Sequence, residues 1–569
     1  MALQLRRAVR DRREAVRFYS CIEVPGDWHK WKETRSPLWN DEGEIDPELQ
    51  RGKVSNLRIA LRRLNGARVE ANGTFSFWAQ IGQATERRGF VPGRLLREGC
   101  LMPAIGGGLC QLSNALYELA LDCEFEILEH HAHSQVVPGS RAQSGRDAAV
   151  AWNYIDLRFR APHDFVIRAE MTRDELVISF WCAQAQAKPD QESLKPVKSS
   201  LMSIPLLDAR PRLDALAHSC ASCGETSCFR HEARPRKRSG TTAWLVDEAW
   251  PEWQSLEQNE REDEDFLLAP LSSALPRFGA NGWSVGAWNH TSTATPQALW
   301  RSVAMRRAAR NGNVWQVQLS STRALSLALE RSIPAGATHL VVAQSLLPHL
   351  WQSGALGGRS FDVLLSRTPL DVLAARLDEA FEVSGDATLR DFRAPLELVR
   401  AERAALNQAN RVFSPHALAA REFGPRARHL EWMMPQAKAI EPDAPRDCLV
   451  FPGPAVARKG AQAVRDAVRE LKMPLVIVGR DFMGADFWRG VELRVLSPAE
   501  PWLPYAHVVV QPALIEHEPR ALLHAVAAKV PVIATPQCGL GEREGVAPVA
   551  FGDEQSLVEA VRIALRTSG

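Results

Sequence analysis

The sequence of 569 residues contains no run of about 18 consecutive apolar residues, so it predicts no membrane-spanning helix. It also has almost no net charge, because 69 Lys and Arg residues offset 67 Asp and Glu residues to give +2. This balance argues against a broad basic surface, and we therefore expect no nucleic-acid partner. Ten cysteines are too few in so long a chain for a disulfide scaffold.

The N-terminal segment lacks the apolar core of a signal peptide. Its first 18 residues are instead rich in arginine. The sequence therefore predicts a cytoplasmic protein. The same basic segment leaves a peripheral contact with a membrane surface open.

The composition is that of an ordinary globular protein, with 45% apolar and 24% charged residues. After residue 240, short apolar strands alternate with helical segments, a pattern that predicts parallel sheets covered by helices on both faces. At roughly 330 residues this part exceeds one open sheet. We expect an irregular lead-in at 1–50, an α+β domain at 51–183, a linker with a cysteine cluster at 184–239, and two α/β Rossmann-type halves at 240–435 and 436–569.

A glycine run leads into a candidate thiol site. The segment GGGLCQ places three glycines directly before a predicted helix, with Cys110 in its first turn. The positive end of the helix dipole favours a thiolate at that position. The alternative is a small buried hydrophobic side chain packed beneath the turn.

Histidines and acids follow this cysteine in the order seen in papain-like and transglutaminase-like thiol enzymes. His133 lies on a predicted strand about 20 residues later, and Asp147 and Asp156 lie on further predicted strands. In such sites the histidine activates the cysteine and an acid orients the histidine. A metal site formed by Cys110 and a histidine is less favoured, because no ligand spacing is evident.

Four segments between about 50 and 165 carry a family resemblance. GTFSFWAQIGQATERRGF, GGGLCQLSNALYELAL, EHHAHS and GRDAAVAWNYIDLRFR occur in this order and resemble the VanW family. The resemblance implies an association with the bacterial envelope. It singles out Gly106–Gly108, Cys110, Gln111, His133 and Asp147 as positions to follow, but gives none of them a role.

A cysteine cluster follows in the segment HSCASCGETSCFRH. Cys220, Cys223 and Cys228, with His231 close behind, supply the ligands of a tetrahedral structural zinc site. An iron–sulfur cluster with a fourth ligand from elsewhere is an alternative. A redox-active pair and no ligand role also remain open. Four protein ligands would leave no coordination position for catalysis, so any metal here would be structural.

The C-terminal part contains two loops placed to bind a ligand. One carries Lys459 and Gly460 between a strand and a helix, and the other carries Glu516 between a strand and a helix from about Arg520 to Ala528. Loops at the carboxyl ends of parallel strands are the usual ligand sites of such sheets. The N-termini of the following helices favour phosphate.

This part of the chain resembles the retaining GT-B glycosyltransferases. The resemblance implies two facing Rossmann-like domains, the second of which holds a nucleotide-sugar donor. It places Glu516 at the donor sugar, Lys459 and Gly460 at the diphosphate, and His524 near the ribose. The family's next loop is matched by residues 539–542, including Gly539 and Glu542.

Two positions depart from the glycosyltransferase pattern. His524 stands where a second glutamate is usual, and it accepts a hydrogen bond only in a suitable tautomer. Pro454 stands where the phosphate-binding arginine is usual, which removes a fixed positive charge. The C-terminal halves are therefore either an active transferase with a variant donor site or a related fold kept for binding.

The leading hypothesis is transfer of a sugar from a nucleotide donor to an envelope-related acceptor with retention. The acceptor class is a glycan, a lipid-linked molecule or a cell-wall precursor. The alternative is a Cys110-dependent thiol hydrolase or transpeptidase joined to a binding-only GT-B-like part. A third hypothesis assigns only binding to both parts.

Overall fold

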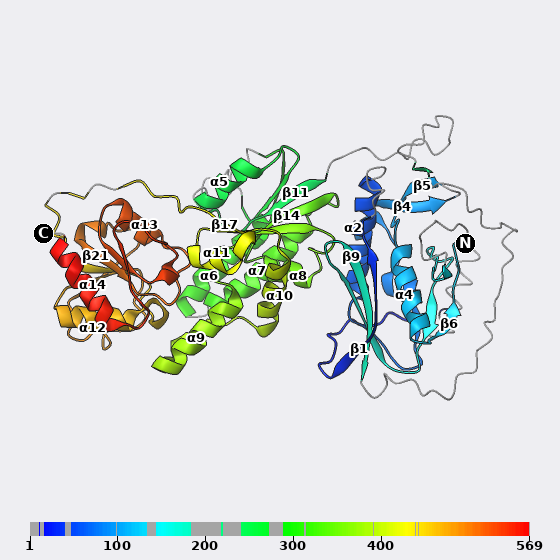
Figure 1. Cartoon of the computed structure of the whole chain (residues 1–569), viewed down its shortest axis with the longest axis horizontal. Coiled ribbons are helices and arrows are strands. Elements are labelled where there is room, and N and C mark those ends of the chain that lie inside the picture. Colours follow the sequence, from blue (N-terminus) through cyan, green and yellow to red (C-terminus); the bar gives the residue numbers. More distant parts are fainter. Residues whose placement is uncertain are drawn as a thin grey trace. The chain divides into compact units, whose positions relative to one another are not determined.

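The computed structural model describes residues 11, 16–39, 47–97, 100–133, 144–183, 218–219, 240–271, 288–311, 314–390, 392–437, 440–441 and 443–567 (Figure 1). The chain forms two compact units. The first comprises Met1–Thr241, Ile333–His339 and Ser353–Ser360, and the second comprises Thr242–Ser332, Leu340–Gln352 and Phe361–Gly569. In the described part of the chain, no helix combines the length and the apolar character needed to span a membrane.

The first unit is built on antiparallel sheets. Its four-stranded sheet has the order β1 (Trp28–Pro37), β9 (Glu175–Ala183), β8 (Phe165–Met171) and β2 (Ala67–Val69). Two smaller sheets have the orders β3 (Thr74–Ser76), β7 (Arg158–Arg160), β6 (Glu126–Glu129), and β10 (His218–Ser219), β5 (Cys100–Ile105), β4 (Pro92–Arg97). The helical elements are α2 (Pro47–Leu64), α3 (Phe77–Ile81), η2 (Glu86–Arg88) and α4 (Cys110–Asp122).

Aromatic side chains form the centre of this unit. Phe125 stacks on Phe180, and Phe165 lies 5.0 Å from both rings. All three side chains are buried in one apolar cluster that also includes the inner faces of α2 and α4. Helix α4 lies beside β1 and β9 (Figure 1), and α2 packs against β8.

Three sequence expectations for this unit were wrong. The lead-in is not wholly irregular, because it contains β1, which pairs with β9 along its whole length. The predicted histidine strand ends at Glu129, so His133 follows the strand rather than lying on it. Asp147 and Asp156 lie outside strands as well. The apolar residues around these positions favour strands, but the backbone hydrogen bonds between strands end before they reach them.

The second unit begins with a seven-stranded sheet. Its order is β13 (His290–Thr293), β12 (Phe266–Ala269), β11 (Thr241–Leu245), β14 (Ala337–Ala343), β15 (Ser360–Leu364), β16 (Val412–Ser414) and β17 (Ala427–His429). The pairings β11–β12, β12–β13, β15–β16 and β16–β17 are parallel. The helical elements are α5 (Pro251–Glu260), α6 (Thr295–Asn311), α7 (Val314–Glu330), α8 (Leu347–Gln352), α9 (Leu370–Ser384), η8 (Ala387–Arg390), α10 (Leu396–Gln408), α11 (Ala417–Glu422) and η9 (Gly424–Arg426).

A six-stranded parallel sheet forms the C-terminal half. Its order is β20 (Leu493–Leu496), β19 (Leu475–Val478), β18 (Cys448–Pro452), β21 (Ala506–Gln511), β22 (Val532–Ala534) and β23 (Val546–Pro548). The helical elements are η10 (Ala457–Lys459), α12 (Ala461–Leu471), η11 (Leu503–Tyr505), α13 (Arg520–Ala527), η12 (Pro536–Cys538) and α14 (Glu554–Thr567). Helices α12 and α14 share one core with the strands, and α13 belongs to another (Figure 1).

These sheets confirm the predicted fold class. An α+β region with antiparallel sheets precedes two parallel-sheet α/β halves, with helices alternating with strands as expected. The alternation requires crossovers that cover both sheet faces. The proposed boundary at residue 435 falls between β17 and β18.

A buried asparagine fastens α2 to the glycine turn before α4. The Asn56 amide nitrogen donates to the Val91 and Gly107 carbonyls at 2.9 Å, and its oxygen accepts from the Val91 N–H at 2.9 Å. Asn56 is fully buried, so no water replaces these bonds.

We expect Asn56→Ala to loosen this turn, because each buried backbone group left unpaired costs about 1–3 kcal/mol. Hydrogen exchange followed by mass spectrometry should show the amides of residues 90–108 exchanging at least about tenfold faster, the factor that 1.4 kcal/mol represents. The control is Asn65→Ala. Asn65 is exposed and accepts a hydrogen bond from the Ala169 N–H on β8, away from the glycine turn. Equal exchange in the two variants would contradict the prediction.

Candidate functional site

The glycine turn sets Cys110 at the first position of α4. Gly106 and Gly108 have φ angles of +76° and +96°, in the left-handed region that favours glycine. A Cβ on Gly108 would lie 2.2 Å from Lys53 Cγ, and one on Gly107 would lie 2.3 Å from the Gly93 carbonyl oxygen. Only glycine therefore permits this close approach. The Cys110 thiol is free and partly exposed.

The structure brings the predicted histidine and acid to this thiol. His133 forms a side-chain hydrogen bond with Cys110, and its Nδ1 lies 2.7 Å from Asp147 Oδ2. Asp147 also accepts from the His133 backbone N–H at 2.7 Å and is only 3% exposed. The bond to Cys110 is the largest cause that raises the pKa of His133 to about 9, and Asp147 adds to it while burial opposes it. The imidazole is therefore mainly protonated at neutral pH.

Side chains from α4 hold the acid loop in place. Asn114 accepts a hydrogen bond from the Ala148 N–H at 2.7 Å. His130 donates through Nε2 to the Asp147 carbonyl at 2.7 Å, and its ring stacks on Tyr117 at 4.1 Å. Sequence reasoning missed Asn114 and Tyr117. The i, i+4, i+7 spacing from Cys110 places all three on one face of the helix and is the signal that identifies them.

Backbone N–H groups at the start of α4 provide a place for a negative charge. Within the described ranges, no hydrogen bond is formed by the N–H groups of Gly108, Leu109 and Cys110. They lie at the positive end of a helix of 13 residues, next to the thiol. Such groups stabilise the oxyanion that forms when a thiolate attacks a carbonyl.

The other candidate acid has a structural role. Asp156 is 1% exposed and accepts hydrogen bonds from Ser76 Oγ at 2.6 Å and Arg158 Nε at 2.9 Å. It also accepts from the Trp78 N–H at 3.1 Å. These contacts fix the start of α3, so Asp147 alone of the two acids orients the histidine.

The predicted metal ligands Cys220, Cys223, Cys228 and His231 lie outside the described residues. In the part of the chain that the structure describes, no group of three or more His, Cys, Asp or Glu side chains is arranged to hold a metal ion. The zinc or iron–sulfur prediction therefore has no structural support.

A second candidate site lies at the carboxyl edge of the C-terminal sheet. Lys459 follows β18 and Glu516 follows β21, two strands that are neighbours in the sheet. Lys459 Nζ lies 2.7 Å from Glu516 Oε2, with the two side chains 12% and 13% exposed. Gly460 has a φ of +83°, and a Cβ there would lie 2.3 Å from the Pro512 carbonyl oxygen. Glycine therefore lets the two loops meet.

Hydrogen bonds keep Glu516 ionised in this setting. Gln511 Nε2 donates to Oε2 at 2.6 Å, and the Glu518 N–H donates to Oε1 at 3.1 Å. Burial acts to raise the pKa of Glu516, but the Lys459 charge and these bonds outweigh it and lower the pKa. Sequence reasoning missed Gln511, although its place at the end of β21 is the expected signal.

The Glu516 loop also contacts the first half of the second unit. His416 donates through Nε2 to the His517 carbonyl at 2.6 Å. Gly539 has a φ of +74°, and a Cβ there would lie 2.1 Å from His416 Nδ1. Trp432 Nε1 donates to the Gly539 carbonyl at 2.9 Å. Gly539 is thus needed where the two halves meet, a role that the sequence did not indicate.

An ion pair strengthens the same contact. Arg520, the first residue of α13, binds both carboxylate oxygens of Glu252 at 2.7 and 2.8 Å. Glu252 is 2% exposed, and the Arg520 guanidinium lies over the rings of Trp250 and Trp432 at 5.6 and 5.2 Å. A bidentate pair of this kind fixes orientation as well as distance.

The first half of the second unit contains a carboxyl group with a raised pKa, that of Glu248. Glu248 follows β11, and burial raises its pKa to about 7, with Asp247 and Glu518 adding to the shift. Arg367 and a hydrogen bond to Ser366 act in the opposite direction. Sequence reasoning missed Glu248. Its position just beyond the carboxyl end of a parallel strand is the signal for it.

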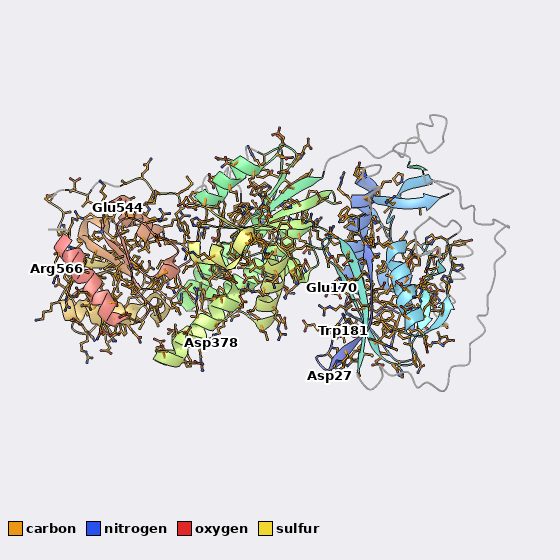
Figure 2. The ribbon with its side chains drawn as sticks, viewed as in Figure 1. Asp27, Glu170, Trp181, Asp378, Glu544 and Arg566 are labelled. Carbon is orange, nitrogen blue, oxygen red and sulfur yellow. The ribbon has the colours of Figure 1, made fainter. Side chains whose placement is uncertain are left out.

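The remaining predicted donor residues lie on neighbouring elements. His524 is half-buried on α13, and Glu542 is exposed in the loop between η12 and β23. Figure 2 labels Glu544 in the same loop, at the surface. Pro454 lies two residues after the end of β18, so no arginine stands at that position. The structure thus groups Lys459, Gly460 and Glu516, while roles for His524 and Glu542 stay predictions.

Two families match separate parts of the chain. Residues 52–181 match the family described as VanW like protein, and residues 446–567 match glycosyl transferases group 1. The first match contains the Cys110 site and the second contains the Lys459–Glu516 pair.

Two curated relatives each match about a quarter of the chain. The vancomycin B-type resistance protein VanW of Enterococcus faecalis is 32% identical over 148 residues, which cover 25% of this chain and 53% of that protein. YoaR of Bacillus subtilis is 27% identical over 133 residues, covering 23% and 43%. The chain thus spans about half the length of these relatives.

Solved structures match a little over half of the chain at low sequence identity. Sucrose-phosphate synthase from Thermosynechococcus elongatus is 14% identical with a TM-score of 0.36, covering 58% of this chain and 90% of that one. Anabaena HepE, in a complex with UDP and glucose, is 12% identical with a TM-score of 0.35, covering 58% and 91%.

The raised pKa of His133 makes the stability of the first unit depend on pH. Because the pKa rises from 6.5 to about 9 on folding, the stabilisation is complete below pH 6.5 and is lost as pH rises through about 9. In calorimetric melting, His133→Gln should lower the unfolding temperature most near pH 6 and progressively less above pH 7. The control His29→Gln removes an exposed histidine. A difference that grows with pH would contradict the assignment.

Proposed function

We propose that this chain, which joins a VanW domain to a group 1 glycosyltransferase domain, transfers a sugar from a nucleotide donor to an envelope-related acceptor. The observation that carries the proposal is the Lys459–Glu516 pair at the carboxyl edge of the C-terminal sheet. It places one cation and one carboxylate, 57 residues apart in the sequence, in contact inside the matched domain. The acceptor class is a glycan, a lipid-linked molecule or a cell-wall precursor.

Lys459 would bind the donor diphosphate. Its ammonium group already lies against a carboxylate, so an anionic donor would replace one negative partner with another. The charge that develops on the departing diphosphate is then balanced by a group fixed in the site before the reaction. The N-terminus of α12, next to Gly460, adds a favourable dipole.

Glu516 would contact the donor sugar. Its pKa is lowered, so it is a carboxylate at neutral pH and accepts hydrogen bonds from sugar hydroxyls. Release of Lys459 to the diphosphate would free Oε2 for this contact. We propose retention at the anomeric carbon on the basis of the group 1 match.

Lys459→Ala should weaken nucleotide-sugar binding by at least about tenfold, because a buried charge–phosphate contact is worth about 1.5–3 kcal/mol. Calorimetric titration with UDP-, GDP- and ADP-glucose measures this. The control Arg489→Ala removes one positive charge from an exposed pair in the same domain and should leave binding unchanged. Equal binding by Lys459→Ala and the wild type would overturn the role of Lys459.

Glu516→Gln separates binding from turnover. Loss of the carboxylate frees Lys459, so binding of the nucleoside diphosphate alone should stay equal or become tighter. Transfer or hydrolysis of the sugar should fall by at least about 100-fold, because the lost contact is made to the reacting sugar. Unchanged turnover in both Glu516→Gln and Lys459→Ala would contradict the transferase proposal.

The Cys110 site supports a second function, an acyl transfer or hydrolysis. The Cys110 sulfur would attack a carbonyl carbon to form a C–S bond, with the negative oxygen on the free N–H groups of α4. His133, protonated at neutral pH, would give its proton to the leaving amine as the C–N bond breaks. Water or a second amine would then take the acyl group from sulfur.

This second function predicts selective alkylation of Cys110. Iodoacetamide near pH 7 should label it before exposed Cys21, whose pKa is raised by burial. Asp147→Asn should slow the labelling of Cys110 by about tenfold or more, because His133 then loses its orienting partner. Peptide mapping gives both rates in one sample. Equal rates for the two cysteines would count against a catalytic thiol.

A further inference from the structure

A buried lysine lies directly beside the turn that leads to Cys110. Lys53, on α2, is only 7% exposed. Its Cα, Cβ and Cγ lie 3.2, 2.8 and 2.2 Å from the position of a Cβ on Gly108. Gly108 precedes Cys110 by two residues, so this lysine and the thiol flank the same turn.

No acid balances this lysine in the described ranges of the chain. Burial lowers the pKa of Lys53 to about 7, and the only charged neighbour that affects it is another cation, Arg94. Arg94 belongs to β4, and its backbone nitrogen lies 2.9 Å from the position of a Cβ on Gly107. Glu48, the acid nearest in sequence on α2, acts on Arg51 instead. A buried ammonium group without a negative partner is costly, which indicates a place for an anion.

A buried amide lies on the same face of α2. Gln50 is 1% exposed, and neither its Nε2 nor its Oε1 has a hydrogen-bond partner in the part of the chain described. It precedes Lys53 by three residues, the spacing that makes side chains neighbours on a helix. Buried polar atoms without a partner in the chain can be satisfied by a bound water, ion or ligand.

We propose that Lys53 and Gln50 bind a carboxylate of the substrate that acylates Cys110. The proposal rests on the second function given above and names its substrate class, an acyl compound with a carboxylate near the reacting carbonyl. Lys53 supplies the positive charge and Gln50 an N–H donor. Gly108 and Leu109 directly precede Cys110 in the sequence. Their N–H groups form no hydrogen bond among the described residues, so they remain available for the reacting oxygen.

Two alkylating agents of nearly equal size but different charge test the proposal. Iodoacetate carries a carboxylate and iodoacetamide does not, and both react at sulfur. At pH 6.5 in the intact chain, Lys53→Met should lower the ratio of the iodoacetate to the iodoacetamide rate at Cys110 by about tenfold. The ratio cancels any change in the reactivity of the thiol, because both agents react with the same sulfur. Lys53→Arg should retain most of the ratio, because it keeps the charge.

The matched control is Lys30→Met. Lys30 is an exposed lysine of the same unit that pairs with Glu33 at 2.7 Å, so its loss should leave the ratio unchanged. Hydrogen exchange of α2 in each variant shows whether the helix remains folded. A ratio that is equal in the wild type and in folded Lys53→Met would overturn the carboxylate site.

A binding measurement keeps the proposal testable if Cys110 does not react. Saturation-transfer NMR with the intact chain should detect N-acetylglycine but not N-acetylglycine amide, and Lys53→Met should abolish the difference. Failure of alkylation with retained acid-selective binding would reject the catalytic thiol and support the anion site. Equal signals from acid and amide in the wild type would reject the anion site.

Discussion

The ion pair between Lys459 and Glu516 is the interaction on which the arrangement of the second unit depends. It joins the loops that follow two neighbouring strands and holds the Glu516 loop at the carboxyl edge of the sheet. The same loop continues to His517 and Arg520, which bind His416 and Glu252 of the first half. The loop that carries Glu516 therefore also joins the two halves of the second unit.

The pair is buried enough for its loss to be costly. Removal of one partner would leave an uncompensated buried charge. Gln511 and the backbone N–H of Glu518 keep Glu516 solvated when Lys459 turns away.

The first unit uses a different constraint, a glycine turn that no other residue fits. Close approach at Gly107 and Gly108 brings α2 against the start of α4 and leaves N–H groups free at the thiol. His133 and Asp147 then complete a hydrogen-bonded series with Cys110. Two separate candidate sites therefore lie in one chain, one around Cys110 and one around the Lys459–Glu516 pair.

Local patterns in the sequence predicted much of this. The glycine run before Cys110, the alternation of strands and helices, and the loops with Lys459 and Glu516 are all encoded over short distances, and the structure contains them. Contacts over long distances were not predictable. β1 pairs with β9 about 140 residues away, and Glu252 binds Arg520 268 residues away.

Polar residues on α2 were missed for a related reason. Lys53, Gln50 and Asn56 suggest a solvated helix face by their chemistry, yet all three are buried in the structure. The periodicity of a helix in the sequence does not show that a turn about 50 residues later covers its polar face. Glu248 was missed likewise, because its raised pKa arises first from burial, with further contributions from residues distant in the sequence such as Glu518.

A crystal structure of the chain with the nucleoside diphosphate of its preferred donor tests the central claim most directly. We expect Lys459 Nζ within about 3 Å of a phosphate oxygen, with the contact to Glu516 Oε2 broken and that carboxylate turned to the sugar position. A nucleotide bound elsewhere, with Lys459 and Glu516 still 2.7 Å apart, would contradict it.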